Sequence, residues 1–357
     1  MKTYISTVII TQLSLLTLIV LVTKNKVLPK RVKTGIIIAS SLIMACAFAE
    51  FSGVLLDGAA PVLKPLHIIV KYIEFCLAPI IPFVFTSALY PMKSKKMIFL
   101  SNIIHITLET LSLFLGIVFY VDDKNVYHHG KLYWLYYLFV FLSMLYLFFN
   151  VAKFGAQFQN RNHSSLLMLF AFFAVGVMFQ NIDSDVKIAW LTVAISMILF
   201  YIYYCNMISQ LDALTELLNR RAYEVHKSSL KRKAYIILFD VNNFKSINDN
   251  FGHNSGDMCL KSVASAIKKV YRKSGLCYRV GGDEFCVIID RKADFCKIED
   301  LNAKLKSQIL THNNDTGTSP SVAVGYALFE PNKTPISDIV KKADEQMYLN
   351  KNHTNEP

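Results

Sequence analysis

The chain has 357 residues, of which 53% are hydrophobic, with a mean hydropathy of +0.36 and a net charge of +12. Such hydropathy excludes an ordinary soluble protein, and the length allows two or three domains. The apolar excess lies in residues 1–208, whereas residues 209–357 alternate like a soluble α/β domain. The first part holds 16 Lys and Arg against 8 Asp and Glu, and the second 22 against 18. The basic surplus therefore lies mostly in a candidate membrane region, and no basic stripe with interleaved aromatic residues indicates nucleic-acid binding.

Residues 1–208 contain seven apolar stretches of the length that a membrane-spanning helix needs, about 20 residues. We expect all-α spans at 4–23, 35–56, 66–90, 97–121, 132–152, 164–181 and 187–208. The first stretch is followed by a strongly basic loop and has no small-residue cleavage pattern. We therefore expect it to be a span rather than a cleaved signal peptide.

The loops between these spans alternate in charge. Basic residues follow the first, third and fifth spans, at Lys24, Lys26, Lys30, Arg31, Lys33, Lys93, Lys95, Lys96, Lys153 and Arg161. The other loops carry Asp57, Asp122, Asp123, Asp183 and Asp185. By the positive-inside rule the basic loops are cytoplasmic. We therefore expect a multi-pass protein of a bacterial cell membrane, with the N-terminus outside and residues 209–357 in the cytoplasm.

Six ionisable residues fall inside the predicted spans: Glu50, His67, Lys71, Glu74, His105 and Glu109. A charge at membrane depth costs about 2.5–3.5 kcal/mol on insertion scales, so such side chains usually face the interior of a helix bundle. Lys71 and Glu74 are three residues apart and can pair on one helix face. Two interpretations stay open. One is a small-molecule pocket lined by Glu50, Glu74 and Glu109; the other is an internal ion pair with side chains that reach the membrane interfaces.

The seven cysteines stand at positions 46, 76, 205, 259, 277, 286 and 296. They form no Cys-x-x-Cys pair and have no His spacing suited to zinc. We therefore expect reduced cysteines that serve as small core residues.

Residues 209–357 follow an α/β order that is long enough for one hydrophobic core. We expect helices at 214–231, 243–250, 255–272, 296–310 and 336–350, and strands at 235–240, 276–280, 285–290 and 320–328. An apolar stripe continues from the last span through Leu211, Leu214, Leu217 and Leu218. This stripe predicts either a dimerising helix or packing against its own domain. For Leu217 and Leu218 we favour packing against the domain.

Two glycines and two carboxylates separate the second and third predicted strands, in the run Gly281-Gly282-Asp283-Glu284-Phe285. Glycine permits a tight hairpin with positive φ and lets a phosphate approach the backbone. Asp283 and Glu284 offer the oxygen ligands that a hard divalent cation prefers. Asp240 ends the apolar run before it, where it either joins this site or caps a helix. Together the three carboxylates predict a site for Mg²⁺, or Mn²⁺, and nucleotide phosphates.

The segment between residues 240 and 257 is dense in Asn, Asp and Gly. Asn248 and Asp257 are suited to reading a guanine edge, because a carboxylate accepts from the N1–H and the exocyclic amine. The alternative interpretation is turn chemistry, which these residue types also favour.

Five motifs in this order resemble those of the GGDEF domain of diguanylate cyclases: Asp212–Arg221, Asp240–Asp257, Arg279–Phe285, Ser321–Gly325 and Ala343–Tyr348. The resemblance covers nearly all of residues 210–351. It implies a palm-like fold, related to nucleotidyl cyclases, with a mostly antiparallel sheet. It also implies the condensation of two GTP into cyclic di-GMP and two pyrophosphates by a homodimer.

The resemblance also implies roles for single residues. Asp240, Glu284 and the carbonyl of Val241 match metal-binding positions, and Asp283 matches a catalytic acidic position beside the metal. Asn248 and Asp257 match the guanine readers. Contacts to the substrate are implied for Phe244, through its backbone, and for Lys245, Lys351, Gly281 and Gly282.

Four positions depart from the family pattern. Asn242 replaces a common acid, Glu216 stands where glycine is usual, and Asn355 replaces an arginine that would grip the triphosphate. The family inhibits itself through an Arg-x-x-Asp pair, of which Arg272 is present but the acid is replaced by Gly275. We therefore expect weak or absent product inhibition.

Residues 1–208 also resemble the seven-helix sensor regions of some bacterial histidine kinases and cyclases, by the helix count and the Lys71-Tyr72, Pro79 and Tyr90 positions. The sequence therefore predicts a diguanylate cyclase that contacts membrane lipid and is regulated by its membrane half. The alternative is a catalytically silent membrane receptor that binds GTP or a partner protein.

Overall fold

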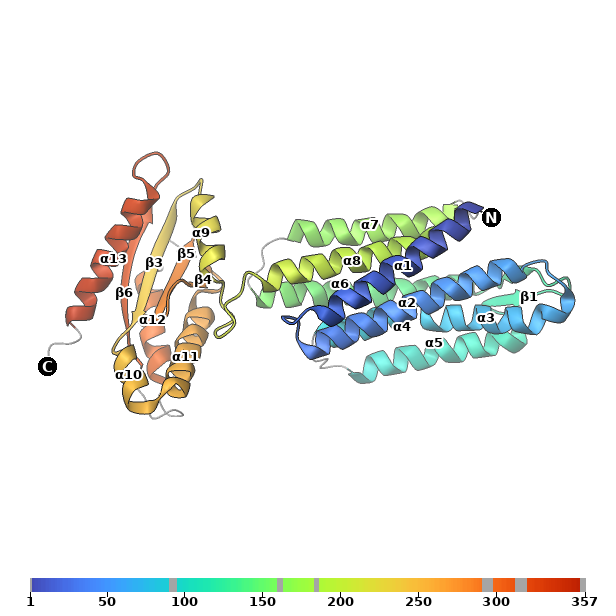
Figure 1. Cartoon of the computed structure of the whole chain (residues 1–357), viewed down its shortest axis with the longest axis horizontal. Coiled ribbons are helices and arrows are strands. Elements are labelled where there is room, and N and C mark those ends of the chain that lie inside the picture. Colours follow the sequence, from blue (N-terminus) through green and yellow to red (C-terminus); the bar gives the residue numbers. More distant parts are fainter. Residues whose placement is uncertain are drawn as a thin grey trace. The chain divides into compact units, whose positions relative to one another are not determined.

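A computed structural model describes residues 2–89, 95–158, 163–182, 186–290, 298–311 and 320–353. The chain divides into two compact units, Met1–Cys205 and Asn206–Pro357, and Figure 1 shows the elements of each. Several residues considered above lie outside the described residues, namely Tyr90, Lys93, Arg161, Asp183, Asp185, Cys296 and Asn355.

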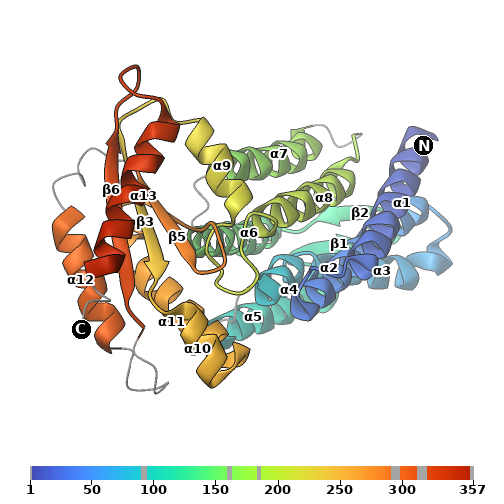
Figure 2. The same ribbon diagram turned by 60° about the vertical axis from the view of Figure 1, so that its left-hand side comes forward.

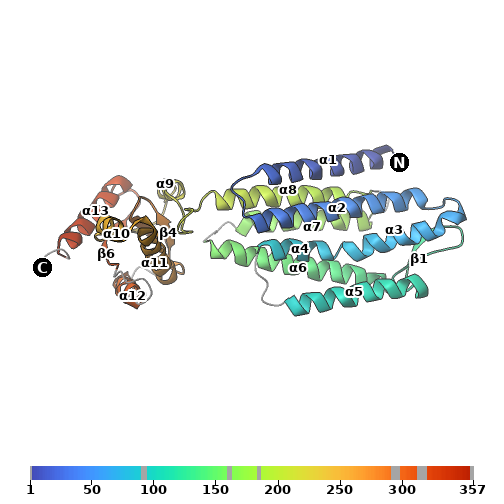
Figure 3. The same cartoon turned by 60° about the horizontal axis from the view of Figure 1, so that its bottom comes forward.

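The first unit is mainly helical. Its helices are α1 (Lys2–Lys24), α2 (Lys30–Leu56), the short η1 (Pro61–Leu63), α3 (Lys64–Leu77), α4 (Ile80–Leu89), α5 (Lys95–Leu115), α6 (Tyr133–Gln157), α7 (His163–Ile182) and α8 (Ala189–Ile208). They run alongside one another, with α2 packed on α1, α3 and α4, as Figure 3 shows. The break between α3 and α4 falls at Pro79, which has no N–H to continue the helix.

Six helices in the described part of the chain are long and apolar enough to cross a membrane: Lys2–Lys24, Lys30–Leu56, Pro61–Leu89, Ile98–Leu115, Tyr133–Ala156 and Ala189–Ile208. The apolar stretch in α7, Ser164–Phe179, is shorter. The count of seven spans therefore stays a prediction. The fourth predicted span was wrong at its end, because α5 stops at Leu115 and the chain then enters a strand.

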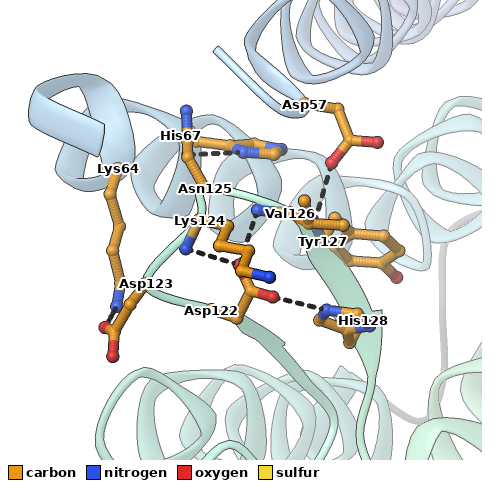
Figure 4. Close-up of polar contacts among 10 residues, drawn as sticks. All are labelled: Asp57, Lys64, His67, Asp122, Asp123, Lys124, Asn125, Val126, Tyr127 and His128. Carbon is orange, nitrogen blue, oxygen red and sulfur yellow. Dashed lines mark hydrogen bonds and ion pairs between the residues drawn. The ribbon is translucent and has the colours of Figure 1, made fainter. Parts of the chain in front are cut away.

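A small hairpin closes one end of this unit, where the sequence predicted no strand. It pairs β1 (Phe119–Val121) antiparallel with β2 (Tyr127–His129). The buried Asn125 holds it to the turn after α2, since its side chain donates to the Leu56 and Ala59 carbonyls at 2.8 and 3.2 Å. His67 of α3 contacts the Asn125 Oδ1 atom at 3.1 Å, as Figure 4 shows. The hairpin is thus fixed to α2 and α3 by buried hydrogen bonds.

The side chains of all six ionisable residues in the predicted spans are buried. The interpretation that they reach the membrane interfaces was therefore wrong for these residues. The Lys71 Nζ atom donates to Glu74 Oε2 at 3.0 Å, which confirms the internal ion pair. Tyr4 donates to Glu50 Oε2 at 3.0 Å from α1. The pocket lined by the three glutamates stays a hypothesis.

The second unit is built on a four-stranded antiparallel sheet, in the order β4 (Leu276–Arg279), β5 (Glu284–Ile289), β3 (Ala234–Val241) and β6 (Val322–Phe329). Its helices are α9 (Arg220–Ser228), α10 (Phe244–Phe251), α11 (His253–Tyr271), α12 (Ile298–Thr311) and α13 (Ile336–His353). The expected antiparallel palm-like architecture is confirmed, and Figure 2 shows α13 lying along the sheet.

Both faces of the central strand β3 are buried, which explains its nearly continuous apolar sequence. Ile237, Phe239 and Val241 pack with α11 and α12 on one face. Ile236 and Leu238 pack on the other face with α9 and α13. Full burial of such side chains stabilises by roughly 1.5–3 kcal/mol each, so the strand that carries Asp240 is held from both sides.

The predicted helix over 214–231 was wrong in its first part. The chain from residue 211 to 218 forms a turn closed by a bridge between Leu211 and Leu218, and α9 begins only at Arg220. Asn219 caps this helix, because its side chain accepts from the Ala222 amide at 3.0 Å. The apolar stripe therefore forms no dimerising helix. Leu217 and Leu218 pack in the domain core, as favoured above.

The six described cysteines, at positions 46, 76, 205, 259, 277 and 286, form no disulfide, and all but Cys205 are buried. This agrees with the expected role of cysteines as small core residues.

Glu216, the residue that stands in place of glycine, has a left-handed backbone with φ of +57°. This conformation raises the free energy of a folded L-residue by roughly 1–2 kcal/mol. Glycine avoids that strain but loses about 0.5–1 kcal/mol more conformational entropy on folding, because the unfolded chain is more flexible at a glycine. We expect Glu216→Gly to stabilise the second unit and raise its Tm by about 2–4 °C per kcal/mol gained. Trypsin resistance of the heated full-length protein measures this shift. Glu216→Ala keeps the strained φ and is the control; equal Tm values for both variants would contradict the prediction.

Candidate active site

The register of β3 with β5 places two of the predicted carboxylates opposite each other. Asp240 and Glu284 are direct partners in this antiparallel pair. The Val241 amide donates to the Asp283 carbonyl at 3.2 Å, so the hairpin turn is attached to the end of β3. Asp240 does not cap a helix, since α10 begins after Asn243. The structure thus brings Asp240 and Glu284 together, with Asp283 in the adjoining turn, whereas a metal site that uses all three acids stays a prediction.

Gly281 and Gly282 of the hairpin between β4 and β5 differ in the space around them. The amides of Val280 and Gly281 both donate to the Glu284 carbonyl, at 3.0 and 3.3 Å. A Cβ atom at Gly281 would lie 2.3 Å from Glu284 Oε2, and one at Gly282 would meet no atom within 4 Å. Neither glycine has a positive φ, so that expectation was wrong. Gly281 leaves room for the carboxylate of Glu284, and Gly282 stays open on its outer side.

The carboxylates concentrate negative charge at this edge. Burial, and then the charges of Asp283, Asp240 and Asp344, raise the pKa of Glu284. Lys351 of α13 forms an ion pair with Asp240 and partly offsets this charge. The family resemblance implied a phosphate contact for Lys351, and the structure places its ammonium group beside the Asp240 carboxylate.

The donor set fits a hard divalent cation, because it consists of carboxylate and carbonyl oxygens in a site of excess negative charge. In the part of the chain that the structure describes, no three His, Cys, Asp or Glu side chains gather closely enough to hold a metal by themselves. Mg²⁺ usually binds through one or two carboxylates and completes its shell with water and substrate phosphates. Asp240 and Glu284 suit this mode, with the Val241 carbonyl beside them.

The predicted guanine readers lie on two consecutive helices. Asn248 is half-buried on α10 and Asp257 is exposed near the start of α11. Gly252, with φ of +80°, makes the turn between them. A Cβ atom at Gly256 would lie 2.0 Å from Asn248 Oδ1. The Asn248 side chain therefore lies against the first turn of α11, one residue from Asp257.

The chain between β3 and α10 presents the predicted phosphate contacts. Asn243 has a left-handed φ of +53° and is followed by Phe244 at the start of α10 and by the exposed Lys245. Amides at a helix N-terminus favour anions. Asn242 is buried; its backbone and side-chain amides donate to Ser321 O and Oγ, both at 2.9 Å. It thus attaches this segment to the chain before β6.

Arg279 is a positioning residue that the sequence analysis did not single out. Its Nη1 atom donates to Asp212 at 3.0 Å, and its Nε and Nη2 atoms donate to the Gly282 carbonyl at 3.2 and 2.7 Å. Thr215 also donates to Asp212; burial alone would raise the Asp212 pKa, but these hydrogen bonds lower it. Arg279 therefore fixes the turn between β4 and β5 to the segment before α9. The sequence held one signal for this contact, because Asp212 and Arg279 carry opposite charges and each opens one of the five motifs.

The region of the expected product-inhibition site has no space for the missing acid. The Gly275 amide donates to the Tyr271 carbonyl at 2.8 Å. A Cβ atom at Gly275 would lie 2.6 Å from the Ile288 carbonyl oxygen. The backbone path therefore excludes any side chain next to Arg272 at this position.

Known proteins resemble the second unit in sequence. The model of the diguanylate cyclase GGDEF domain matches residues 209–357. Diguanylate cyclase DgcP of Escherichia coli is 32% identical over 155 residues, 41% of this chain and 45% of that protein. Diguanylate cyclase TpbB of Pseudomonas aeruginosa is 34% identical over 151 residues, 39% of this chain and 34% of that protein. The chain thus spans less than half the length of these curated relatives.

Among solved structures, the GGDEF domain of DgcB from Caulobacter crescentus in complex with c-di-GMP shares 24% sequence identity, with a TM-score of 0.37. The match covers 40% of this chain and 91% of that chain.

The matched region contains all five motifs and the whole antiparallel sheet. The paired carboxylates, the glycine hairpin and the helices that carry Asn248 and Asp257 all lie within it. Residues 209–357 of this chain therefore form a GGDEF domain, similar to those of the diguanylate cyclases named above.

Proposed function

We propose that the chain is a membrane-bound diguanylate cyclase that condenses two GTP into cyclic di-GMP and two pyrophosphates. The observation that carries this proposal is the pairing of Asp240 with Glu284, beside Asp283, inside a GGDEF domain. The curated relatives named above are diguanylate cyclases, which supports the reaction. We assign residues 1–208 to the membrane sensor and residues 209–357 to the catalytic domain.

In the proposed reaction the 3′-hydroxyl of one GTP attacks the α-phosphate of the other. A phosphodiester bond forms, the bond to pyrophosphate breaks, and the hydroxyl proton is released; a second, equivalent step closes the ring. Asp240, Glu284 and the Val241 carbonyl would hold Mg²⁺ or Mn²⁺, with Asp283 beside them. When bound, the cation offsets the negative charge that develops on the α-phosphate and the leaving group.

The remaining residues bind and orient the substrate. Asn248 and Asp257 would read the guanine edge, and the Phe244 amide, Lys245 and Lys351 would contact the phosphates. Gly281 and Gly282 would leave the backbone open to them. Catalysis is then mainly positioning and electrostatic stabilisation. Each domain holds one GTP, so two domains must face each other and the active form is a homodimer.

The membrane half would regulate this dimer. The basic loops favour a cytoplasmic side for the catalytic domain, where GTP is available, and an N-terminus outside. The buried charged residues of the membrane half would respond to a small-molecule ligand within a bacterial cell membrane. A change in the last helix would then alter how the two catalytic domains face each other.

The first test incubates the purified full-length protein with GTP and Mg²⁺ and measures cyclic di-GMP. We expect the double variant Asp283→Ala/Glu284→Ala to lose about 10²–10³-fold or more of the rate, because it removes preorganised charge at the reacting phosphate. Glu330→Gln is the control, since Glu330 follows the other end of β6, where Phe329 pairs with Ala234. GTP binding without product in the wild type would instead favour the silent receptor.

A second test concerns guanine recognition. Gly256→Ala places a methyl group where Asn248 Oδ1 lies, at 2.0 Å, so the Asn248 side chain must move. We expect the KM for GTP to rise about ten-fold, equivalent to 1.4 kcal/mol of binding, with kcat near the wild-type value. Ser255→Ala, one residue earlier, is the matched control. An unchanged KM in Gly256→Ala would argue against a role for Asn248 in binding GTP.

A third test concerns product inhibition. Because Gly275 leaves no space for an acid beside Arg272, we expect added cyclic di-GMP to leave the initial rate of the wild type unchanged. The rate of Arg272→Ala should respond in the same way. Inhibition of the wild type that Arg272→Ala relieves would contradict this expectation.

A further inference from the structure

The membrane unit contains a partly open apolar cavity of about 80 Å³. Its walls come from α2, α4, α6, α7 and α8, which Figure 3 shows within one bundle. Its lining residues include Ala39, Phe85, Met144, Phe170, Met197 and Phe200. Neither Glu50, Glu74 nor Glu109 lines it. The cavity is therefore separate from the buried charges that the sequence indicated.

The chemistry of the lining selects an uncharged occupant. Among the described residues that line the cavity, Ser196 alone carries a polar side chain. Its hydroxyl already donates to the Thr192 carbonyl of the same helix at 2.8 Å. A polar ligand would lose its hydrogen bonds to water and gain none here. An apolar molecule gains dispersion contacts with walls that otherwise face empty space.

The size of the cavity selects a small occupant. An engineered apolar cavity of about 150 Å³ stays dry and binds benzene, and this one is about half as large. Met144 of α6 and Met197 of α8 both line the cavity, and unbranched methionine side chains adapt readily to a new neighbour. A short alkyl chain therefore fits with side-chain movement alone.

The cavity also contacts the helix that leads into the catalytic domain. Phe200 of α8 packs edge-on against Phe85 at a ring distance of 4.5 Å. The Phe200 ring lies 6.3 Å from that of Tyr204, which stacks on Phe154 at 5.8 Å. Tyr204 is buried, one turn before α8 ends at Ile208. An occupant that displaces Phe200 therefore acts on the last turns of α8.

We propose that this cavity is a binding site for a small uncharged apolar molecule, of the size of a short alkyl chain, taken up from the bilayer. Binding repacks Met197 and Phe200 and so biases the position of α8. The regulatory consequence rests on the proposed cyclase function, whereas the binding site itself does not.

The test uses the full-length protein in lipid nanodiscs and a six-carbon alkyl diazirine as the photoreactive probe. After illumination, mass spectrometry of the peptides quantifies the label on α8. We expect saturable labelling at Met197 and Phe200 that excess n-hexane removes. Ser196→Phe fills the cavity and should lower this labelling about ten-fold, as expected when 1.4 kcal/mol of binding is lost. Leu199→Phe is the matched control, because Leu199 is exposed on the same helix and does not line the cavity.

Labelling that rises linearly with probe, or that is equal in Ser196→Phe and Leu199→Phe, would overturn the proposal. Ala39→Leu on α2 provides a second filling variant if Ser196→Phe fails to fold. Cyclic di-GMP formation is measured on the same samples. Saturable labelling without cyclic di-GMP would reject the cyclase function and retain the binding site. Cyclic di-GMP without saturable labelling would reject the binding site and retain the cyclase function.

Discussion

The pairing of β3 with β5 is the constraint on which the candidate active site depends. Side chains alternate along a strand, so a slip of one residue would exchange the two faces of β3. It would move Ile237 and Phe239 into the core shaped for Ile236 and Leu238, and Asp240 away from Glu284. The hydrophobic cores on both faces of the sheet therefore hold Asp240 opposite Glu284. The same burial brings like charges together, as the raised pKa of Glu284 indicates. Lys351 offsets part of this charge, and a bound cation would offset more.

Much of the catalytic unit could be predicted because its signals are local. The strand β3 is an almost continuous apolar run up to Asp240, and the hairpin is marked by Gly281 and Gly282 between two strand-forming runs. The turn before α9 could not be predicted from spacing, since Leu211, Leu214 and Leu218 also fit a helix. Its fold depends on Arg279, a residue more than sixty positions later, which binds Asp212. The strands β1 and β2 were missed because each has three residues, too few for a visible alternation.

The first unit, with its long apolar helices, separates polar from apolar interactions. His67, Lys71 and Glu74 lie at intervals of four and three residues on one face of α3. His67 contacts Asn125, and Lys71 donates to Glu74. Gly53 leaves space for the Lys71 side chain, and Glu50 adds a second negative charge near it. The apolar cavity lies among helices that include α8 but not α3. The sequence could not predict which of these charged side chains face the bundle interior. Apolar composition defines the length of a span but not the helix face that packs inward. Burial of all six ionisable residues settles that these faces point into the bundle.

The folded segment after α8 has a consequence for modularity. The Asn219 side chain donates to the Ser209 carbonyl at 2.8 Å, and its amide donates to the Gln210 carbonyl at 2.8 Å. Residues 209–219 are therefore folded as part of the catalytic domain, so they do not form a flexible linker after α8. Each residue inserted into a helix rotates the chain beyond the insertion by about 100°. If the membrane half regulates the catalytic domain as proposed, exchanging it for another helical unit keeps the regulation only where the helical phase is kept. Changes of about seven residues, two turns, are then tolerated and single insertions are not.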